Sequence, residues 1–365
     1  MAGSGFGTNF RITTWGETHG AGVGVVVDGC PAGLPLERED VQKYLDRRKP
    51  GQSKYTTQRK EGDQVEILSG IFEGRTTGTP ISMVVYNKDQ RSKDYSNIKD
   101  IYRPGHADFT FDMKYGFRDY RGGGRSSGRE TIGRVAAGAV AAKVLKELGI
   151  EIKAYAKAIA GIEVSKDHFD FAEMNNNPFN MPDKEAAKLV QEKADQMIKE
   201  MDSIGGIIEC QITGMPVGIG ETVFDKLDAE LSKAIMSIGS VKGFEIGDGF
   251  EAANLRGSEN NDDFICVDGK VEKETNHSGG VLGGMSDGSA IVFRAAIKPT
   301  PSIAQTQKTV NRDLDNVEIE IHGRHDPMIV PRAVVVVESM AAVTILDGVL
   351  KNLGATMDNL SLIHI

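Results

Sequence analysis

Hydrophobic residues recur along this chain at two spacings, which predict a mixture of strands and helices. Runs rich in β-branched residues predict strands, and these are Val23–Asp28, Val65–Leu68, Ile81–Tyr86, Ile207–Thr213, Ala290–Ile297 and Val317–Ile321. Apolar residues at helical spacing predict helices, and these are Glu37–Arg48, Ile132–Leu148, Lys184–Met201, Phe224–Ser237 and Arg332–Leu350. Helix Lys184–Met201 is amphipathic, because Val190, Ala194 and Met197 fall on one stripe.

Two distant segments repeat one local pattern, a strand followed by a Gly-x-Pro-x-Gly turn and then a helix. Gly29, Pro31 and Gly33 recur as Gly214, Pro216 and Gly218 at a constant offset of 185 residues. Such a repeated pattern can also arise by chance, since Gly and Pro are common in turns. The alternative to chance is one domain, 1–365, made of two similar halves, about 1–175 and 184–365, that share a core.

The composition of the chain limits the classes of protein to which it can belong. The 365 residues allow one large domain or two to three smaller ones. A net charge of −9 argues against general nucleic-acid or anionic-membrane binding. No apolar run approaches the roughly 20 residues that cross a bilayer, and the N-terminus lacks the apolar core of a signal peptide. Three dispersed cysteines without a CxxC pair fit a reducing compartment. We therefore expect a soluble cytoplasmic protein.

Two basic islands stand out in this acidic chain. Arg118–Thr131 holds four arginines, three consecutive glycines and two serines just before an alanine-rich helix. Glycines and a helix start expose N–H groups to an anion, and arginine forks match phosphate oxygens. Asp46–Lys60 adds six basic residues. The first island, Arg118–Thr131, carries neither a Walker nor a dinucleotide fingerprint. A solvated surface is the alternative for each, but the two together favour a multiply anionic small ligand.

Three histidines lie in turn-like settings beside glycine or proline: His19, His106 and His325. A histidine there can act as acid or base near neutral pH, and a surface or structural histidine is the alternative for each. Without an HxxxH or CxxC pattern the sequence predicts no metal site.

Two further segments are candidates for chemistry. Asp326 follows Arg324 and His325, which favours an ionised base or charge partner, with a capping aspartate before Pro327 as the alternative. Lys298–Ser302 follows a predicted strand and can meet a phosphate or the edge of a flavin ring. A plain turn that ends the strand is the alternative.

Taken together, these segments resemble chorismate synthase. The similar motifs run in the family's order over nearly the whole chain, and they are Gly16–Gly20, Asp46–Arg59, Asp89–Ser92, Arg103–Asp108, Tyr120–Ser127, Gly243–Phe250, Asn276–Gly284, Lys298–Ser302 and Gly323–Pro327. The ordered set is far more specific than any single motif.

The resemblance implies a reaction. The family converts 5-enolpyruvylshikimate 3-phosphate to chorismate and phosphate, the last common step of aromatic biosynthesis, by an anti 1,4-elimination. The reaction needs reduced FMN but has no net redox change. A substrate with one phosphate and two carboxylates explains basic islands in an acidic protein. A lone aspartate is a poor base for a weakly acidic C–H, and an electron-rich flavin can assist.

The resemblance also implies roles for individual residues. His19 is implied to protonate reduced flavin and His106 to serve the leaving phosphate or the substrate side. Ser127 and Asp326 are implied to form a relay in which Asp326 helps flavin N5 act as base. The implied substrate contacts are Arg48, Lys54, Arg103, Arg129 and Arg324, of which Arg48 and Lys54 are also candidate NADP contacts. The implied flavin contacts are Arg125, Ser126, Ser127, Gly239, Ser240, Gly283, Lys298, Pro299, Thr300, Pro301, Ser302 and Arg324.

The chain departs from the family pattern at a few positions. Thr18 replaces serine, Gly128 replaces alanine, Lys54 replaces arginine, and Gly239–Ser240 replaces the commoner Asn-Ala pair. Lys54 loses the bidentate fork of arginine, so its contact is the most affected.

The fold implied by the resemblance is α+β, with helices layered between antiparallel sheets, and the implied assembly is a homotetramer. Two functions from other classes remain as alternatives: an NAD(P)H-dependent flavin reductase, with NADPH as hydride donor, and a non-catalytic anion- or RNA-binding protein. The acidic balance and the few aromatic residues in the islands weigh against RNA.

Overall fold

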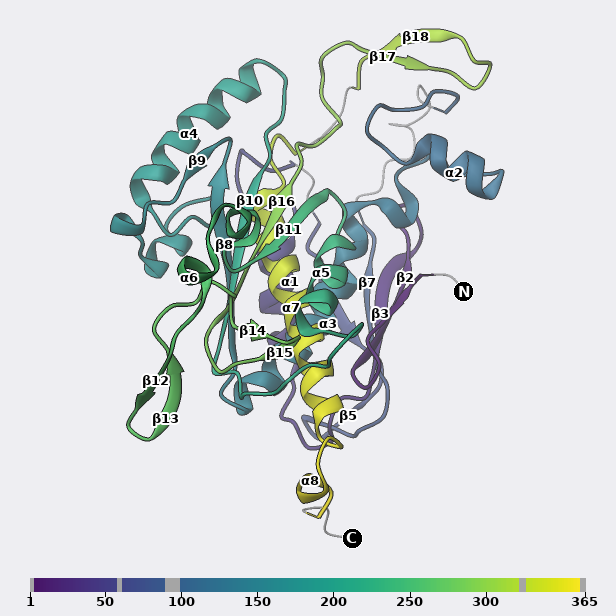
Figure 1. The fold of residues 1–365 in the computed structure, drawn as a ribbon. Helices are drawn as coiled ribbons and strands as arrows, with labels where there is room; N and C mark the ends of the chain where they lie inside the picture. Colours follow the sequence, from purple (N-terminus) through teal and green to yellow (C-terminus); the bar gives the residue numbers. More distant parts are fainter. Residues whose placement is uncertain (1–2, 58–60, 89–98, 322–325, 362–365) are drawn as a thin grey trace.

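The structure, a computed structural model, describes residues 3–57, 61–88, 99–321 and 326–361. Within these residues two five-stranded antiparallel sheets flank a layer of helices (Figure 1). The strands of the first sheet are, in spatial order, β1 (Gly5–Phe6), β2 (Arg11–Gly16), β3 (Gly22–Asp28), β7 (Ile81–Tyr86) and β4 (Val65–Ile67). The second sheet contains β11 (Val241–Ile246), β16 (Ile291–Ile297), β10 (Gly206–Thr213), β8 (Glu151–Ile159) and β9 (Ile162–Glu163).

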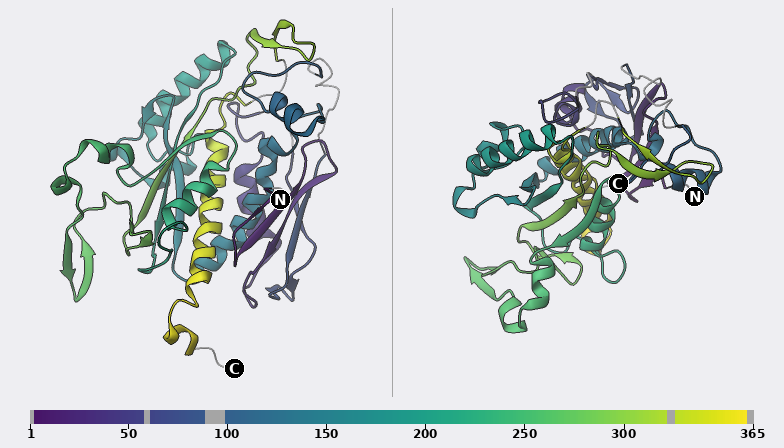
Figure 2. Two further views of the ribbon diagram at one scale, coloured as in Figure 1. Left: turned by 45° about the vertical axis from the view of Figure 1, so that its right-hand side comes forward. Right: turned by 90° about the horizontal axis from the view of Figure 1, so that it is seen from above.

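Two long helices, α3 (Thr131–Glu147) and α7 (Val330–Asn352), lie against each other between the sheets (Figure 2). Helix α3 packs on β2 and β3 of the first sheet, and α7 packs on β8 and β10 of the second. Gly138 lets the helices approach closely, because a Cβ there would lie 2.3 Å from the Cβ of Ser339. The expected mixed α+β fold, with antiparallel sheets packed against helices, is confirmed.

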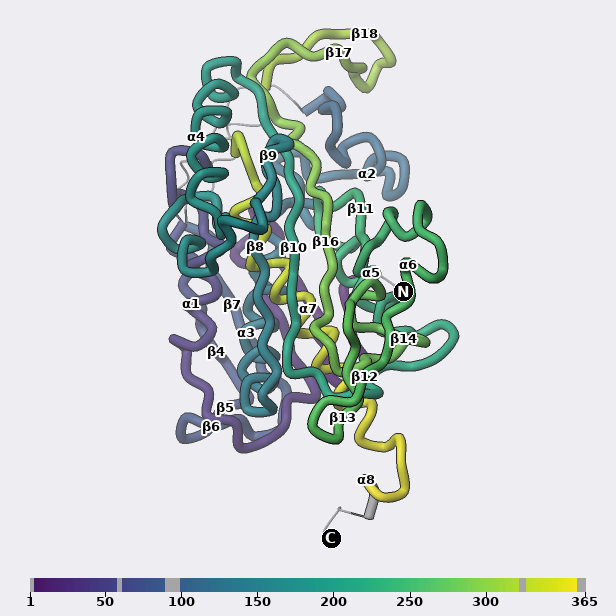
Figure 3. Tube along the Cα trace, turned by 60° about the vertical axis from the view of Figure 1, so that its left-hand side comes forward, coloured from purple at the N-terminus to yellow at the C-terminus, as the bar shows by residue number. Residues whose placement is uncertain are grey.

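Three further helices pack around this layer: α1 (Arg38–Arg48), α4 (Lys184–Lys199) and α5 (Leu227–Met236). Helix α4 lies beside β9 at the edge of the second sheet (Figure 3). It is amphipathic as predicted, and the Asp183 carboxylate caps it by accepting hydrogen bonds from the backbone N–H groups of Glu185 and Ala186. The five predicted helices and six predicted strands are all confirmed to within a few residues at their ends.

The 23 residues of α7 are apolar enough and long enough to cross a membrane. Most of the helix is buried, with α3, α5, β8 and β10 packed around it, so α7 is a core helix. The expectation that no apolar run approaches membrane length was therefore wrong. The sequence of α7 is apolar on every side because the helix is enclosed on every side.

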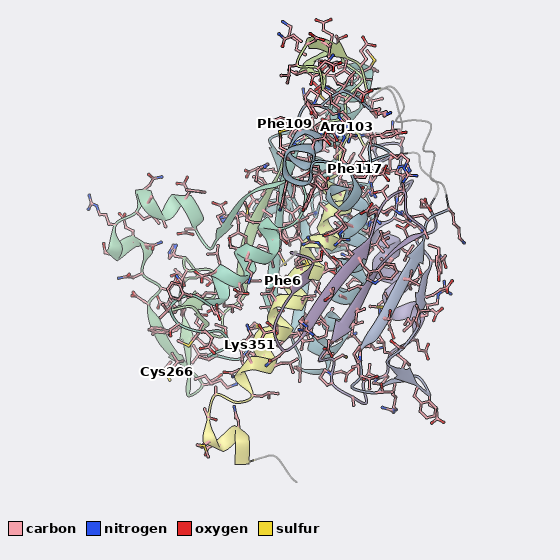
Figure 4. The ribbon with its side chains drawn as sticks, turned by 90° about the vertical axis from the view of Figure 1, so that its right-hand side faces the viewer. Phe6, Arg103, Phe109, Phe117, Cys266 and Lys351 are labelled. Carbon is pink, nitrogen blue, oxygen red and sulfur yellow. The ribbon has the colours of Figure 1, made fainter. Side chains whose placement is uncertain are left out.

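Several smaller elements complete the fold. They are β5 (Ile71–Phe72), β6 (Arg75–Thr76), α2 (Asp108–Tyr115), α6 (Gly257–Asn260), β12 (Phe264–Val267), β13 (Lys270–Lys273), β14 (Val281–Leu282), β15 (Met285–Ser286), β17 (Gln307–Val310), β18 (Asn316–Ile319) and α8 (Met357–Ser361). The β12–β13 hairpin projects from the body and carries the exposed Cys266 (Figure 4). Cys30 and Cys210 are buried, and all three thiols are free.

The repeated turn has the same hydrogen bonds at both of its occurrences. The Thr76 hydroxyl donates to the Pro31 carbonyl oxygen (2.6 Å) and accepts from the Leu34 N–H (3.0 Å). The Ser286 hydroxyl donates to the Pro216 carbonyl oxygen (2.6 Å) and accepts from the Ile219 N–H (2.9 Å). Strands β8 and β9 already belong to the second sheet, which therefore begins at Glu151, earlier in the chain than the boundary expected near 175–184.

Candidate active site

The Lys298–Ser302 segment continues from the end of β16 and packs against the loop that precedes α2. The Ser302 hydroxyl lies 2.8 Å from His106 Nε2, and Lys298 Nζ donates to the Gly105 carbonyl oxygen at 3.1 Å. The backbone N–H of Lys298 donates to the Ser240 carbonyl oxygen at 2.9 Å. Three sequence-predicted segments thus meet here, and we call this group the His106 cluster.

Hydrogen bonds fix the tautomer of His106. Its Nδ1 lies 3.0 Å from the carbonyl oxygen of Pro104, which can only accept, so Nδ1 carries the proton. In the neutral ring Nε2 is then an acceptor for the Ser302 hydroxyl. Burial lowers the pKa of His106, and the positive charges of Arg103 and Lys298 act in the same direction. The ring is therefore neutral at neutral pH, with Nε2 able to take a proton.

Arg103 is tied to the carboxylate of Asp108. Its Nε and Nη2 donate to the two carboxylate oxygens at 2.7 and 2.8 Å, and both side chains are buried. Burial alone would raise the pKa of Asp108, but the hydrogen bonds and charge of Arg103 hold it below its usual value. Arg103 therefore shapes the loop that carries His106.

Two arginines share one buried carboxylate. Arg48, at the end of α1, donates from Nη1 to Asp63 Oδ2 at 3.0 Å. Arg129, in a 3-10 turn before α3, donates from Nη1 to Asp63 Oδ1 at 3.0 Å and from Nε to Asn87 Oδ1 at 2.5 Å. The exposed fractions of the Arg48, Asp63 and Arg129 side chains are 3%, 0% and 9%. We call these three residues the arginine–aspartate triad.

The carboxylate of Asp326 lies next to this triad. Its Oδ1 accepts from the backbone N–H of Thr57 (2.7 Å), and its Oδ2 accepts from Arg332 Nη1 (2.7 Å). Arg332 also donates from Nε to the backbone carbonyl oxygen of Arg48 at 3.0 Å. Arg332 thus joins Asp326 to the end of α1.

The glycine- and arginine-rich loop wraps the end of β2. Arg125 donates to the carbonyl oxygens of Gly16 and Thr14, each at 3.1 Å, and to the Thr14 hydroxyl at 2.6 Å. Ser127 caps the next turn by accepting from the backbone N–H of Arg129 at 3.3 Å. At Gly122 an added Cβ would lie 2.7 Å from His19 Cδ2. The glycine is therefore needed for the histidine ring to pack on the backbone.

The segment before β10 connects these groups. The Ser203 hydroxyl donates to the Thr300 carbonyl oxygen at 2.7 Å. The backbone N–H of Ile204 donates to the Pro327 carbonyl oxygen at 3.0 Å. One short stretch of chain therefore holds the Lys298–Ser302 segment next to the segment that begins with Asp326. The His106 cluster and the triad with its neighbour Asp326 belong to one region of the molecule.

Residues 10–350 match the family model described as chorismate synthase. The chain is 68% identical to a chorismate synthase of Lachnospira eligens over 358 residues, which cover 98% of each chain. It is 56% identical to one of Methanococcoides burtonii, over 96% of this chain and 97% of that one. This chain belongs to the chorismate synthase family. A crystal structure of chorismate synthase is similar at a TM-score of 0.77 and 30% identity, over 98% of this chain and 96% of that one.

Several positions implied by the chorismate synthase resemblance fall outside this region or outside the described residues. Lys54 is exposed and pairs with Asp195 of α4 at 2.8 Å, which raises its pKa. Gly283 lies in the β14–β15 hairpin, which precedes β16, whereas Lys298–Ser302 follows it. Arg324 and His325 lie outside the described residues. No hydrogen bond within the described part of the chain joins Ser127 to Asp326, so the expected relay is not a direct contact.

Sequence reasoning missed two charged residues of the site. Asp63 holds both buried arginines, and Arg332 holds Asp326. The signal for Asp63 was present, since Glu61 and Asp63 directly follow the basic stretch that ends at Lys60. Arg332 falls in the first turn of α7, where a hydrophobic pattern hides it. Arg118 bonds to Asp112 on α2 and to the carbonyl oxygens of Lys99 and Ile101, and Arg121 pairs with Asp119 in the loop.

A separate pocket lies at the other end of the molecule, near Phe6 and Lys351 (Figure 4). Its walls include the carboxylates of Glu221, Asp225 and Glu230. Lys351, which also lines it, is paired with Asp347 at 3.2 Å. These walls would repel a substrate that carries a phosphate and two carboxylates, so this pocket does not suit the reaction.

Proposed function

We propose that the chain carries out its family's reaction between the His106 cluster and the arginine–aspartate triad. The family's reaction converts 5-enolpyruvylshikimate 3-phosphate to chorismate and phosphate. One C–O bond to phosphate and one C–H bond break, with no net redox change. The observation that carries this placement is the pair of arginines, Arg48 and Arg129, buried side by side in a protein of net charge −9.

The arginines are suited to the substrate's anions. Burial lowers the pKa of Arg48 to about 10, and Asp63 opposes that effect, so the guanidinium stays charged at neutral pH. Planar guanidinium groups bind phosphate and carboxylate through paired hydrogen bonds. We assign Arg48 and Arg129 as the inner clamps. Arg103, Lys54 and Arg324 are further proposed contacts, with Lys54 reaching the substrate only after leaving Asp195.

Two histidines are proposed to handle protons. His106 presents a neutral Nε2, and an incoming phosphate would favour the protonated ring by adding negative charge beside it. The imidazolium could then give that proton to the departing phosphate. His19, packed on Gly122, is the second proposed proton donor. Ser127 and Asp326 complete the proposed catalytic set, with Asp326 as a carboxylate that accepts a proton.

The residues near Lys298 suit a flavin. Thr300 Oγ1 is buried and makes no hydrogen bond in the described residues, and burial lowers the pKa of the nearby Lys298 ammonium. A buried polar atom without a partner is uncommon and fits a ligand's polar edge. We propose that reduced FMN binds along Lys298–Ser302, Gly239–Ser240 and Arg125–Ser127, with Gly283 and Arg324 as further contacts. When bound, the flavin supplies an electron-rich ring that eases loss of phosphate.

Three wider features are also proposed. The matching turns at Pro31 and Pro216 support a duplicated chain whose halves divide near Glu151. The family resemblance supports a homotetramer in the cytoplasm. NADPH is required only if the enzyme reduces its own flavin, and Arg48 and Lys54 are then its candidate contacts.

The deciding assay is anaerobic. Purified protein receives chemically reduced FMN and 5-enolpyruvylshikimate 3-phosphate, and phosphate and chorismate are measured. We expect both products in equal amounts. Flavin reduction by NADPH without phosphate release would instead favour a flavin reductase. Salt-sensitive RNA binding with no turnover would favour an anion-binding protein.

A second assay addresses the source of reduced flavin. Oxidised FMN and NADPH are added to the protein with substrate and no separate reductase. Turnover under these conditions assigns a flavin reductase activity to this chain, and its absence assigns flavin reduction to another protein.

A further inference from the structure

Asp63 occupies an unusual place between the two inner arginines. Each of its carboxylate oxygens accepts one guanidinium N–H, from Arg129 and from Arg48, both at 3.0 Å. The side chain is fully buried and its two partners nearly so. Because one carboxylate spans both cations, Asp63 sets the spacing between two groups that belong to different helical segments.

The backbone of Asp63 is itself held in place. Its φ of 42° lies in the left-handed region, which costs a residue other than glycine about 1 kcal/mol or more. The Gln42 side chain on α1 donates to the Asp63 carbonyl oxygen at 3.2 Å and accepts from the Val65 N–H at 3.0 Å. A strained residue that is clamped on both sides fits a site where position matters more than local stability.

The triad also leaves binding capacity unused. The triad has two guanidinium groups and one carboxylate, and the buried Glu61 carboxylate lies 3.7 Å from Arg129 Nη2, beyond hydrogen-bond distance. Among the described residues, Arg129 Nη2 is buried without a hydrogen bond. Buried N–H groups normally have a hydrogen-bond partner. An anion placed between the arginines would supply one.

We propose that Asp63 is a positioning residue for substrate binding, which aligns Arg48 and Arg129 to grip one anionic group of the substrate together. The inference rests on the proposed function, because the arginines are assigned there as clamps. Asp63 does not touch the reacting atoms. It acts through the arginines, and its loss weakens binding more than it slows the chemical step.

The test is Asp63→Asn, which keeps the shape but replaces one acceptor with an N–H₂ donor facing an arginine. We expect KM for 5-enolpyruvylshikimate 3-phosphate to rise about 10-fold or more, with a much smaller change in kcat. Asp63→Glu should recover part of the affinity. In an Arg48→Gln background the effect of Asp63→Asn should shrink, because the clamp is already broken.

The matched control is Asp40→Asn. Like Asp63, Asp40 is an ion-paired aspartate. It lies on α1, is bonded to Lys43 and Lys143, and is outside the proposed site. It should lose stability without a change in KM. KM unchanged in folded Asp63→Asn, or effects that add fully in the double variant, would overturn the proposal. If Asp63→Asn does not fold, Asp63→Ser, which also removes the carboxylate, takes its place, and an unchanged KM in that variant would overturn the proposal equally.

A binding measurement separates this inference from the proposed function. Calorimetric titration of wild type and Asp63→Asn with inorganic phosphate tests the arginine pair without any turnover. A wild-type protein that binds phosphate but does not convert the substrate refutes the proposed function alone. Equal phosphate affinity in wild type and variant refutes the role of Asp63 alone.

Discussion

Lys273 offers a quantitative test of how the β12–β13 arm is anchored. Its ammonium is almost fully buried, and four oxygen atoms lie within hydrogen-bond distance of its three N–H groups, from Asp287 (2.7 Å), Ser278 (2.9 Å), Asp262 (3.1 Å) and Asn276 (3.2 Å). Lys273→Met keeps the stem and removes the charge, which leaves two buried carboxylates without their cation. Breaking a buried ion pair from one side costs roughly 3–5 kcal/mol. We therefore expect the free energy of unfolding to fall by about that amount at pH 7.

The pH dependence of this loss has a definite sign. Burial alone would raise the pKa of Asp262, but hydrogen bonds from Ser278, Thr275 and His277 hold it far below its usual value. A depressed pKa contributes stability above the unfolded value near 4, which is lost as the pH falls. In the variant the carboxylates protonate more easily. The stability gap between wild type and variant should therefore narrow as the pH falls toward 4.

Denaturant titrations of both proteins at pH 7 and pH 4 measure the gap. Lys233→Met is the matched control, since Lys233 is exposed, forms a surface ion pair with Glu230 on α5 and lies over the Phe6 ring. It should change stability by no more than about 0.5 kcal/mol. A gap below about 1 kcal/mol at pH 7, or one that widens on acidification, would refute the reasoning. Hydrogen exchange should show the loss first in the arm.

Three variants test the proposed chemistry. His106→Ala should lower kcat at saturating substrate by about 100-fold or more, because the ring is the proposed acid–base group; turnover near wild type would exclude that role. Asp326→Asn should lose most turnover yet keep FMN affinity, measured by flavin fluorescence, and a loss of FMN binding would make Asp326 structural. Gly122→Ala should displace His19 and lower kcat, since its Cβ would lie 2.7 Å from the ring. Gly128→Ala is its control, because a Cβ there meets no atom within 4 Å, and equal activity of the two variants would contradict the packing argument.

Much of the fold could be predicted because local pattern and burial agree. Helix α4 shows this best, since its apolar stripe is the face it buries. Strand β8 was missed because five of its nine residues are alanine or lysine, which also suit a helix. Its strand conformation comes from pairing with β10, some 50 residues later, which no local pattern reports. The layering of α3 on α7 likewise joins segments far apart in the chain, and the close approach at Gly138 is visible only in the tertiary structure.

The candidate site, like the fold, could be predicted only in part from the sequence. Residue types and motifs pointed to Arg48, Arg129, His106 and the Lys298–Ser302 segment. Arginine and histidine near glycine-rich turns are readily recognised as residues that bind anions or transfer protons. The residues that hydrogen bond to these side chains could not be predicted from the sequence. Asp63 is 66 residues from Arg129, and Ser302 is 196 residues from His106. Only the tertiary fold shows that Arg103 and Lys54 are each held by a carboxylate.

The hydrogen bonds that join the first strands to α7 have a consequence for the synthesis of the protein on the ribosome. The carboxylate of Asp347 on α7 accepts hydrogen bonds from the backbone N–H groups of Thr8, Asn9 and Phe10, which lie 337 to 339 residues earlier. The first sheet and the helix that packs on it, α3, are translated early, but α7, which packs on α3, and the Asp347 carboxylate are translated last. A nascent chain therefore keeps the apolar face of α3 that contacts α7 uncovered until synthesis is nearly complete. We expect chains cut before α7 to aggregate, because that face then stays exposed to solvent.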